Sequence, residues 1–402
     1  MLLKSNYLIT ILLLLTTKLM LFSTTFNDNI IYIIATITSL LIIFFNHEKK
    51  TIKANNFIGL VLLVLSTMIF SFSKINNDVS LLNFIIPINL ITILMAYISI
   101  LYNPLVMKKA LITYSNIMSC IIFTGLICYI ALSLNIFSPT DIVHASDHAD
   151  ERGYFSFYGL VYYPSWISSN IFGLTFYRFT SVFWEPGTLG LYLIFLISIE
   201  LINDDIKSRN YKIAIYIFSG FLSLSLVFIF CIITLVLFYL LSKRISQKAS
   251  KRKLIFRTII IFITIAIFLA SYDFLHQLIL YRLDFDVNRG FVGNTRSGSF
   301  SSFLSQFSDG NILQQLFGFG PYAEFDGETT SIFLKLYQRG ILGFTLFFMS
   351  ICFFAIDTKN KYLYASWIVG LLALTQIEGA IFFIIMMIIQ INKKQSENIS
   401  TL

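Results

Sequence analysis

Long apolar runs separated by short polar segments recur along the whole chain. A run of about 20 apolar residues is long enough for one helix to cross the hydrocarbon core of a bilayer. The pattern predicts transmembrane helices at 7–25, 30–45, 57–73, 81–101, 111–134, 186–202, 212–222, 224–241, 254–272, 329–355, 362–376 and 379–391.

Two of the apolar runs, 211–241 and 362–391, are longer than a single crossing needs. Gly220 and Ser223 lie near the middle of the first run, and Glu378 lies near the middle of the second. A charge at the bilayer midplane is costly, so each run is predicted as two short helices. This division gives about twelve helices and puts both termini on the same side.

The composition agrees with one all-α polytopic membrane domain over 1–402. The chain is 57% hydrophobic and 12% charged, whereas soluble domains contain about 25% charged residues. Most of its 29 lysines and arginines fall in loops on one side of the predicted layout, such as 243–257, and this side is therefore assigned as cytoplasmic. The net charge of +8 thus has a topological cause, and nucleic-acid binding is not predicted.

Two long polar loops, 135–183 and 273–328, fall on the opposite side of the layout. Both contain arginines and carboxylates in quantity. This mixture suits a catalytic or binding surface outside the cytoplasm, whereas a transport pathway would place such charges within the spans.

The first candidate site is the segment from Arg178 to Gly190, which runs into a predicted helix. Pro186 suits the first helical position, and a helix start with Gly187 offers free amides to an anion. Arg178 can clamp the same anion, and Glu185 can act as a general base. The alternative is structural: Glu185 caps the helix, and Arg178 pairs with it.

The second candidate site is a set of three arginines in the second loop, Arg282, Arg289 and Arg296, which are evenly spaced. We expect these arginines to bind an anionic substrate. The alternative is that they are solvated and pair with Asp284 and Asp286.

The third candidate site is the glycine-rich turn 318–331 with the helix that follows it. Glu328 lies just before this helix and is a second candidate for the base, because clustered acids raise one another's pKa. Arg339, within the helix, is a further candidate to bind the anion. The alternative is an acidic, capped helix start.

Other features predict less chemistry. His144 and His148 lie among acids in a loop, and we expect a solvated surface there and no metal. The aromatic segment 154–177 suits the membrane interface. All four cysteines lie in apolar segments, which argues against a disulfide framework. The chain has no P-loop and no dinucleotide-binding glycine pattern, so no cofactor is expected.

With these residues in view, the chain resembles the O-antigen polymerases of the Wzy type, within a group that includes the O-antigen ligases. The resemblance rests on the two long outer loops, on the segment from Arg178 to Gly190, and on Gly318-Phe-Gly320 followed by 334–343. It implies a GT-C-like fold in a bacterial inner membrane, with the active site facing the periplasm.

The resemblance also implies the reaction and its partners. A growing glycan would move from undecaprenyl diphosphate to a hydroxyl of a repeat unit on a second undecaprenyl diphosphate. Arg178, Arg282, Arg289, Arg296, Arg339 and Gly187 would bind the diphosphate, and Glu185 or Glu328 would be the base. A chain-length regulator and a flippase are expected partners, besides the lipid bilayer.

Two other functions stay open at this point. An O-antigen ligase would transfer the finished glycan to lipid A-core from the same donor. Ligases of this group carry a histidine at the turn before the last long helix, where this chain has Glu328 and Thr329. A flippase or transporter of lipid-linked oligosaccharides is the alternative of another class.

Overall fold

The computed structural model describes residues 2–17, 19–20, 28–45, 54–72, 88, 91–97, 99, 103–136, 138–144, 153–158, 161–164, 168–171, 174–183, 185–203, 205–246, 285–286, 290–291, 297–320, 323–326 and 331–355. The helices predicted at 254–272, 362–376 and 379–391 lie outside the described residues. The helix predicted at 81–101 is described in part, at 88, 91–97 and 99.

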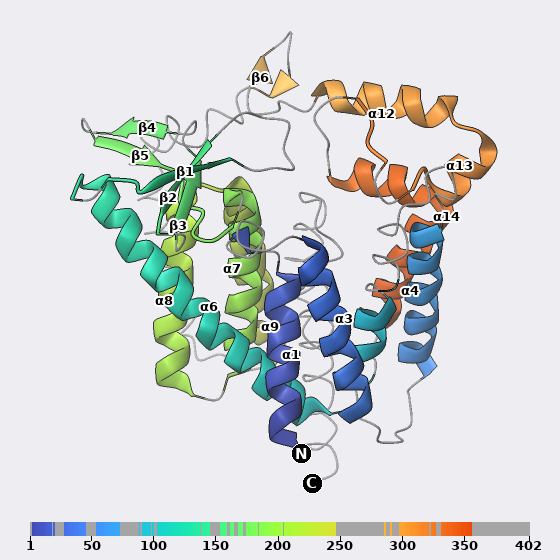
Figure 1. The fold of residues 1–402 in the computed structure, drawn as a ribbon, viewed down its shortest axis with the longest axis horizontal. Helices are drawn as coiled ribbons and strands as arrows, with labels where there is room; N and C mark the ends of the chain where they lie inside the picture. Colours follow the sequence, from blue (N-terminus) through green and yellow to red (C-terminus); the bar gives the residue numbers. More distant parts are fainter. Residues whose placement is uncertain are drawn as a thin grey trace.

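Most of the described residues are helical, which confirms the helical class (Figure 1). The helices are α1 (Leu2–Thr16), α3 (Asp28–Phe45), α4 (Ala54–Phe72), α6 (Pro104–Ser133), α7 (Pro186–Leu201), α8 (Ile206–Leu222), α9 (Leu226–Ser246), α12 (Ser297–Asp309), α13 (Ile312–Phe317) and α14 (Ser331–Ala355).

The predicted division of the run 211–241 is confirmed, because α8 ends at Leu222 and α9 begins at Leu226. Three predicted helix starts are wrong by several residues. The first helix, predicted at 7–25, runs instead as α1 from Leu2 to Thr16. The helix α8 begins at Ile206, where the Asp205 side chain accepts a hydrogen bond from the Ser208 amide. The helix α6 begins at Pro104 rather than near 111, because Asn103 caps it and proline suits its first turn.

Both long loops contain strands, which an all-α description omits, and the second loop, 273–328, also contains α12 and α13, which were not predicted. The strands β1 (Asp141–His144), β2 (Gly153–Phe157) and β3 (Val161–Pro164) form an antiparallel sheet. A second pair is formed by β4 (Ser168–Ile171) and β5 (Leu174–Tyr177), and a third by β6 (Phe285–Asp286) and β7 (Gly290–Phe291). Aromatic residues are favoured in strands, so the aromatic segment pairs here through contacts such as Phe155 with Tyr163.

The described parts of the two long loops lie at the same end of the helical bundle (Figure 1). The strands lie above α6, α7 and α8, and α12 lies across the same end above α14. The helix α1 begins at the opposite end. Residues more than a hundred positions apart in the sequence are thereby gathered at one end of the molecule.

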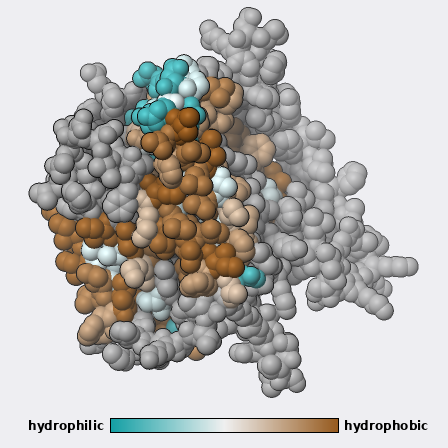
Figure 2. Space-filling model, turned by 90° about the vertical axis from the view of Figure 1, so that its right-hand side faces the viewer, coloured by the Kyte–Doolittle hydropathy of each residue, from teal (hydrophilic) through white to brown (hydrophobic). Residues whose placement is uncertain are grey.

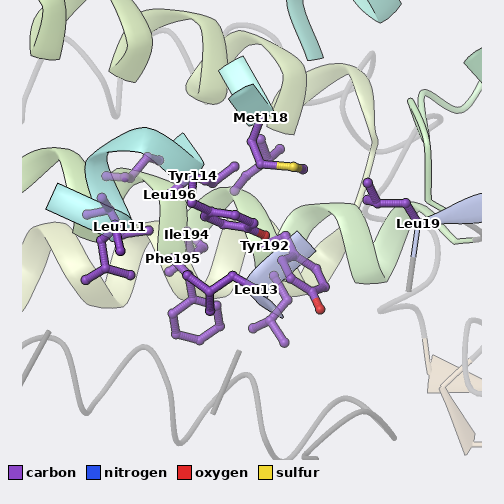
Figure 3. Close-up of a cluster of buried hydrophobic side chains, with 14 of the residues drawn as sticks. Leu13, Leu19, Leu111, Tyr114, Met118, Tyr192, Ile194, Phe195 and Leu196 are labelled. Atoms are coloured by element: carbon purple, nitrogen blue, oxygen red, sulfur yellow. The ribbon is translucent and has the colours of Figure 1, made fainter. Parts of the chain in front are cut away.

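The core is centred on α7, which is buried almost along its whole length. Figure 3 shows Tyr192, Ile194, Phe195 and Leu196 of this helix among side chains of α1 and α6. The Tyr192 ring stacks on Phe183 with 4.8 Å between the ring centroids. The helix α7 is therefore the element around which the neighbouring helices are arranged.

The outer surface is unusually apolar. Two helical segments in the described part, Leu105–Ser133 and Phe333–Phe353, are long and apolar enough to cross a membrane. Large apolar side chains on one face of α3 and one face of α4 point outward, and Figure 2 shows a broad hydrophobic surface on the side of the molecule that contains α4 and α14. The exposed members are Ile30, Ile33, Ile37, Leu40 and Phe44 on α3, and Phe57, Val61, Leu65 and Met68 on α4.

A buried ionic network joins α6, α7 and α8 near the end of α7 that is remote from the strands. The Glu200 carboxylate is 0% exposed. It accepts hydrogen bonds from Lys212 Nζ at 3.0 Å, Ser115 Oγ at 2.6 Å and Asn203 Nδ2 at 2.9 Å. The Tyr216 hydroxyl lies 2.9 Å from Ser115 Oγ. Three helices are thus held by one carboxylate, whose charge Lys212 balances.

We predict that Lys212→Met destabilises the protein by about 3–5 kcal/mol, because it leaves the buried Glu200 carboxylate without its counter-ion. Thermal unfolding in detergent measures the effect. The double variant Glu200→Gln/Lys212→Met should recover most of the loss, since it removes both charges. Lys207→Met, at an exposed position of the same helix, is the control, and an equal effect at both lysines would contradict the prediction.

Candidate functional site

The loop that joins β5 to α7, which we call the Arg178 loop (178–185), is fixed by main-chain hydrogen bonds. The Phe179 amide donates to Leu222 O at 3.2 Å, and Ser181 O accepts from the Tyr162 amide at 2.8 Å. Val182 O accepts from the Met20 amide at 2.8 Å. The loop is therefore held by α8, the three-stranded sheet and the segment after α1.

Arg178 closes the turn between α8 and α9. Its Nε donates to Ser223 O at 3.1 Å, and its Nη2 donates to Leu224 O at 3.0 Å. Carbonyls at the carboxyl end of a helix lack helical partners and carry the negative end of the helix dipole. A half-buried guanidinium at this point satisfies both the hydrogen bonds and the dipole, so Arg178 has a defined structural role.

Glu185 stands at the start of α7 with an exposed side chain. It occupies the N-cap position with φ −131° and ψ 144°, and its side chain makes no capping hydrogen bond. The alternative that Glu185 caps this helix is therefore wrong. Pro186 begins the helix, as predicted, and Gly187 next to it is half-buried.

Gly190 allows two helices to pack closely. A Cβ at this position would lie 2.9 Å from both Phe228 Cβ and Ser225 Oγ. The absence of a side chain lets α7 approach the start of α9 closely. The same contact brings the start of α7 near the turn that Arg178 closes.

Aromatic rings of β2, β3 and β5 pack together behind this loop. Tyr163 stacks with Tyr177 at 5.9 Å between centroids, and Phe155 meets Tyr177 edge-on at 5.5 Å. Burial raises the pKa of the Tyr163 hydroxyl, so this group stays neutral at physiological pH. The Tyr129 hydroxyl of α6 donates to Tyr177 O at 2.7 Å, which ties β5 to the bundle.

Arg339 lies in a separate place, between α4 and α14. It is 2% exposed. Its Nη1 donates to Ser66 Oγ at 2.8 Å, and its guanidinium lies 4.4 Å from the Phe70 ring centroid and 5.0 Å from the Phe347 ring centroid. Ser66 Oγ in turn donates to Gly343 O at 2.7 Å. Arg339 therefore links two helices, and its burial does not fit the prediction that it binds an anionic substrate.

The glycine-rich turn of the third candidate site docks on a break in α14. Gly340 has φ 66° and ψ 176°, which interrupts the helix. The break leaves the carbonyls of Tyr337 and Gln338 without helical partners, and the amides of Phe319 and Gly320 donate to them at 3.0 and 3.3 Å. The glycines at 318 and 340 are thus required by one close backbone contact.

The acids near this turn are exposed where they are described. Glu324 is exposed, and Asp326 accepts a hydrogen bond from Gln306 Nε2 at 2.9 Å. The predicted site residues Glu328, Arg282, Arg289 and Arg296 lie outside the described residues. Within the described part, no cluster of three or more His, Cys, Asp or Glu residues could hold a metal ion.

No family model, no curated protein and no solved structure matches this chain. The candidate site therefore rests on its own geometry. Arg178 and Glu185 lie at the two ends of the Arg178 loop and Gly187 lies in the first turn of α7, whereas Arg339 lies between α4 and α14. The Glu200–Lys212 pair was missed by sequence reasoning, since nothing in the spacing of the two residues predicts that they meet.

We predict that Gly340→Ala destabilises the protein, because the backbone conformation of Gly340 is essentially restricted to glycine and costs another residue about 1–3 kcal/mol. The alanine Cβ would also lie 2.4 Å from both Gly318 N and Leu316 O, so the backbone must shift. Thermal unfolding in detergent measures the loss. Gly343→Ala is the control, since its Cβ would meet Ile69 Cγ2 at 3.1 Å in the helical part of α14. Equal melting temperatures for the two variants would refute the close-contact role.

Proposed function

We propose that this chain is a membrane-embedded polysaccharide polymerase that transfers a glycan from undecaprenyl diphosphate to a lipid-linked repeat unit. The observation that carries the proposal is the start of α7. An exposed carboxylate that does not cap its helix stands there, at the end of a loop that begins with an arginine fixed by main-chain carbonyls. This place lies at the end of the bundle where the described parts of both long loops gather (Figure 1).

A membrane environment is supported by the outward apolar faces of α3 and α4. Monomeric soluble proteins rarely expose contiguous apolar patches of this extent. In the proposed arrangement the chain crosses the inner membrane about twelve times, with both termini in the cytoplasm and the Arg178 loop facing the periplasm.

The proposed reaction needs a base, a stabilised leaving group and no cofactor. A hydroxyl of the acceptor sugar attacks the anomeric carbon of the donor, and the bond from that carbon to the diphosphate oxygen breaks. The leaving diphosphate keeps the electron pair, and Glu185 accepts the hydroxyl proton. The positive end of α7 and the guanidinium of Arg178 stabilise the developing phosphate charge.

The Arg178 loop suits this role because it is rigid. Catalytic electrostatics work best when charges are held in place before the reaction starts. The two carbonyls hold the guanidinium, and three main-chain hydrogen bonds hold the loop. Glu328 remains the alternative base in this proposal, and Arg282, Arg289 and Arg296 are proposed to complete the diphosphate site.

The activity test uses the purified chain in phospholipid vesicles with its own undecaprenyl-diphosphate repeat unit and no nucleotide sugar. A ladder of longer glycans is expected. Glu185→Gln should slow it by about 10²- to 10⁴-fold, because the amide cannot accept the proton. Asp309→Asn, an exposed carboxylate on α12, is the control. A Glu185→Gln variant that polymerises at the wild-type rate excludes Glu185 as the base.

The test of Arg178 must separate loss of diphosphate binding from loss of folding, because Arg178 also closes the α8–α9 turn. Arg178→Lys keeps the charge but loses the paired hydrogen bonds, whereas Arg178→Ala loses both. We expect the lysine variant to retain more activity than the alanine variant at equal melting temperature. If activity follows melting temperature alone across both variants, Arg178 is structural only.

The proposed sidedness is tested by cysteine labelling in a variant without native cysteines. Asp141→Cys lies on the exposed strand β1, and Lys207→Cys lies at the exposed start of α8. A membrane-impermeant maleimide added to spheroplasts should label position 141 and spare position 207. Labelling of 207 with protection of 141 would place the Arg178 loop in the cytoplasm and overturn the proposal.

A further inference from the structure

The apolar side chains of helix α13 are exposed, whereas its two glutamines, Gln314 and Gln315, are half-buried. Ile312 is 74% exposed and Leu313 is 66% exposed, and Leu316 and Phe317 are also exposed. No residue of this helix is buried. A helix that packs on a protein core has the reverse arrangement.

The polar side chains of α13 are used at its own start. Gln314 and Asn311 form a capping box, in which each side chain bonds the main chain of the other. Gln315 Nε2 donates to Ser308 O at 3.1 Å, in the last turn of α12, and to Gly310 O at 3.0 Å, just after that helix. These bonds fix the turn and keep the glutamines off the outer face.

The helix is attached to the protein through its backbone, so its most exposed side chains, Ile312 and Leu313, are not needed for attachment. The Leu316 carbonyl lies against Gly340, and Gly318 lies against Gln338 O, at the break in α14. These side chains are then available to contact something outside the protein. Because four of the six residues of α13 are apolar, the surface that they contact is expected to be apolar.

The outer face of α13 continues the apolar exterior of the bundle. On the side of the molecule that contains α4, α13 and α14, Figure 2 shows hydrophilic atoms gathered at the top and hydrophobic atoms directly below them, continuing downward. Exposed apolar side chains follow on α14, at Ile341, Leu342 and Met349, and on α4, at Leu65 and Met68. The polar turn Ser308–Asn311 lies next to this surface in the sequence, at the start of α13.

We propose that α13 is a membrane-interface anchor, with Ile312, Leu313, Leu316 and Phe317 in contact with the lipid at the boundary of headgroups and acyl chains. A helix with one apolar face and one polar face lies in the plane of the interface, with its apolar face at this depth. Continuity with the apolar exterior favours lipid over a protein partner. The inference rests on the membrane part of the proposed function and is independent of the reaction.

The anchor would fix the height of the second loop relative to the bilayer. The Gly318–Gly340 contact joins α13 to the break in α14, so the depth of α13 also sets the depth of that break. The turn with Glu324 and Asp326 follows directly and would be held at the membrane surface, where the glycan and the diphosphate of a lipid-linked substrate meet. A substrate anchored in lipid would then approach from the side on which α13 lies.

The test measures the lipid exposure of single nitroxide labels in the full-length chain. Native cysteines are replaced, and the labels are placed at Leu313→Cys and Leu316→Cys on α13. Ser308→Cys and Asn311→Cys in the polar turn are matched controls, and Leu65→Cys on α4 reports the membrane itself. The protein is reconstituted in vesicles of phosphatidylethanolamine and phosphatidylglycerol, and collision rates with oxygen and with a water-soluble nickel chelate are compared.

We expect the ratio of oxygen to nickel collisions to be several-fold higher at 313 and 316 than at 308 and 311. A ratio at 313 equal to that at 308 would place α13 in water and overturn the proposal. Low collision rates with both reagents at 313 and 316 would show that protein covers the helix, which also overturns it. If position 65 is lipid-exposed in either case, the membrane part of the proposed function survives. If the collision ratio at position 65 shows that this residue is in water, both the membrane part of the proposed function and the anchor role of α13 are refuted.

Discussion

The burial of α7 is the constraint on which the rest of the described structure depends. A helix surrounded by protein must have a non-polar side-chain surface, and it must find partners for polar groups at both ends. At its far end, Glu200 is held by Lys212, Ser115 and Asn203. At its near end, Pro186 needs no hydrogen bond for its nitrogen, and the helix starts at the molecular surface.

At several places, main-chain polar groups at a helix end or break find hydrogen-bond partners elsewhere in the chain. Arg178 donates to the carbonyls that follow α8, and the amides after Gly318 donate to the carbonyls exposed by the break in α14. Arg339 and Ser66 link α4 to the second part of α14. Residues that the sequence marked as ligand-binding candidates therefore have structural roles in the described part of the chain.

Glu185 is the member of the first candidate site for which the described structure offers no structural task. Its side chain is exposed and does not cap α7. An acid kept at the positive end of a helix without a capping bond is suited to chemistry with a substrate. The apolar outer faces of α3 and α4 suit the membrane environment of the proposed function.

The sequence by itself determined the helical class, the positions of most described helices and the division at Ser223, because the periodicity and length of apolar runs are local properties. It also located Pro186 at a helix start, since proline has a fixed φ and no amide hydrogen. The tertiary structure alone decided that the aromatic segment pairs as strands and that Arg178 meets Ser223 and Leu224. It also decided that Arg339 is buried and that Glu200 meets Lys212. These contacts join residues that are distant along the chain, and their formation depends on how the helices pack rather than on any nearby residue.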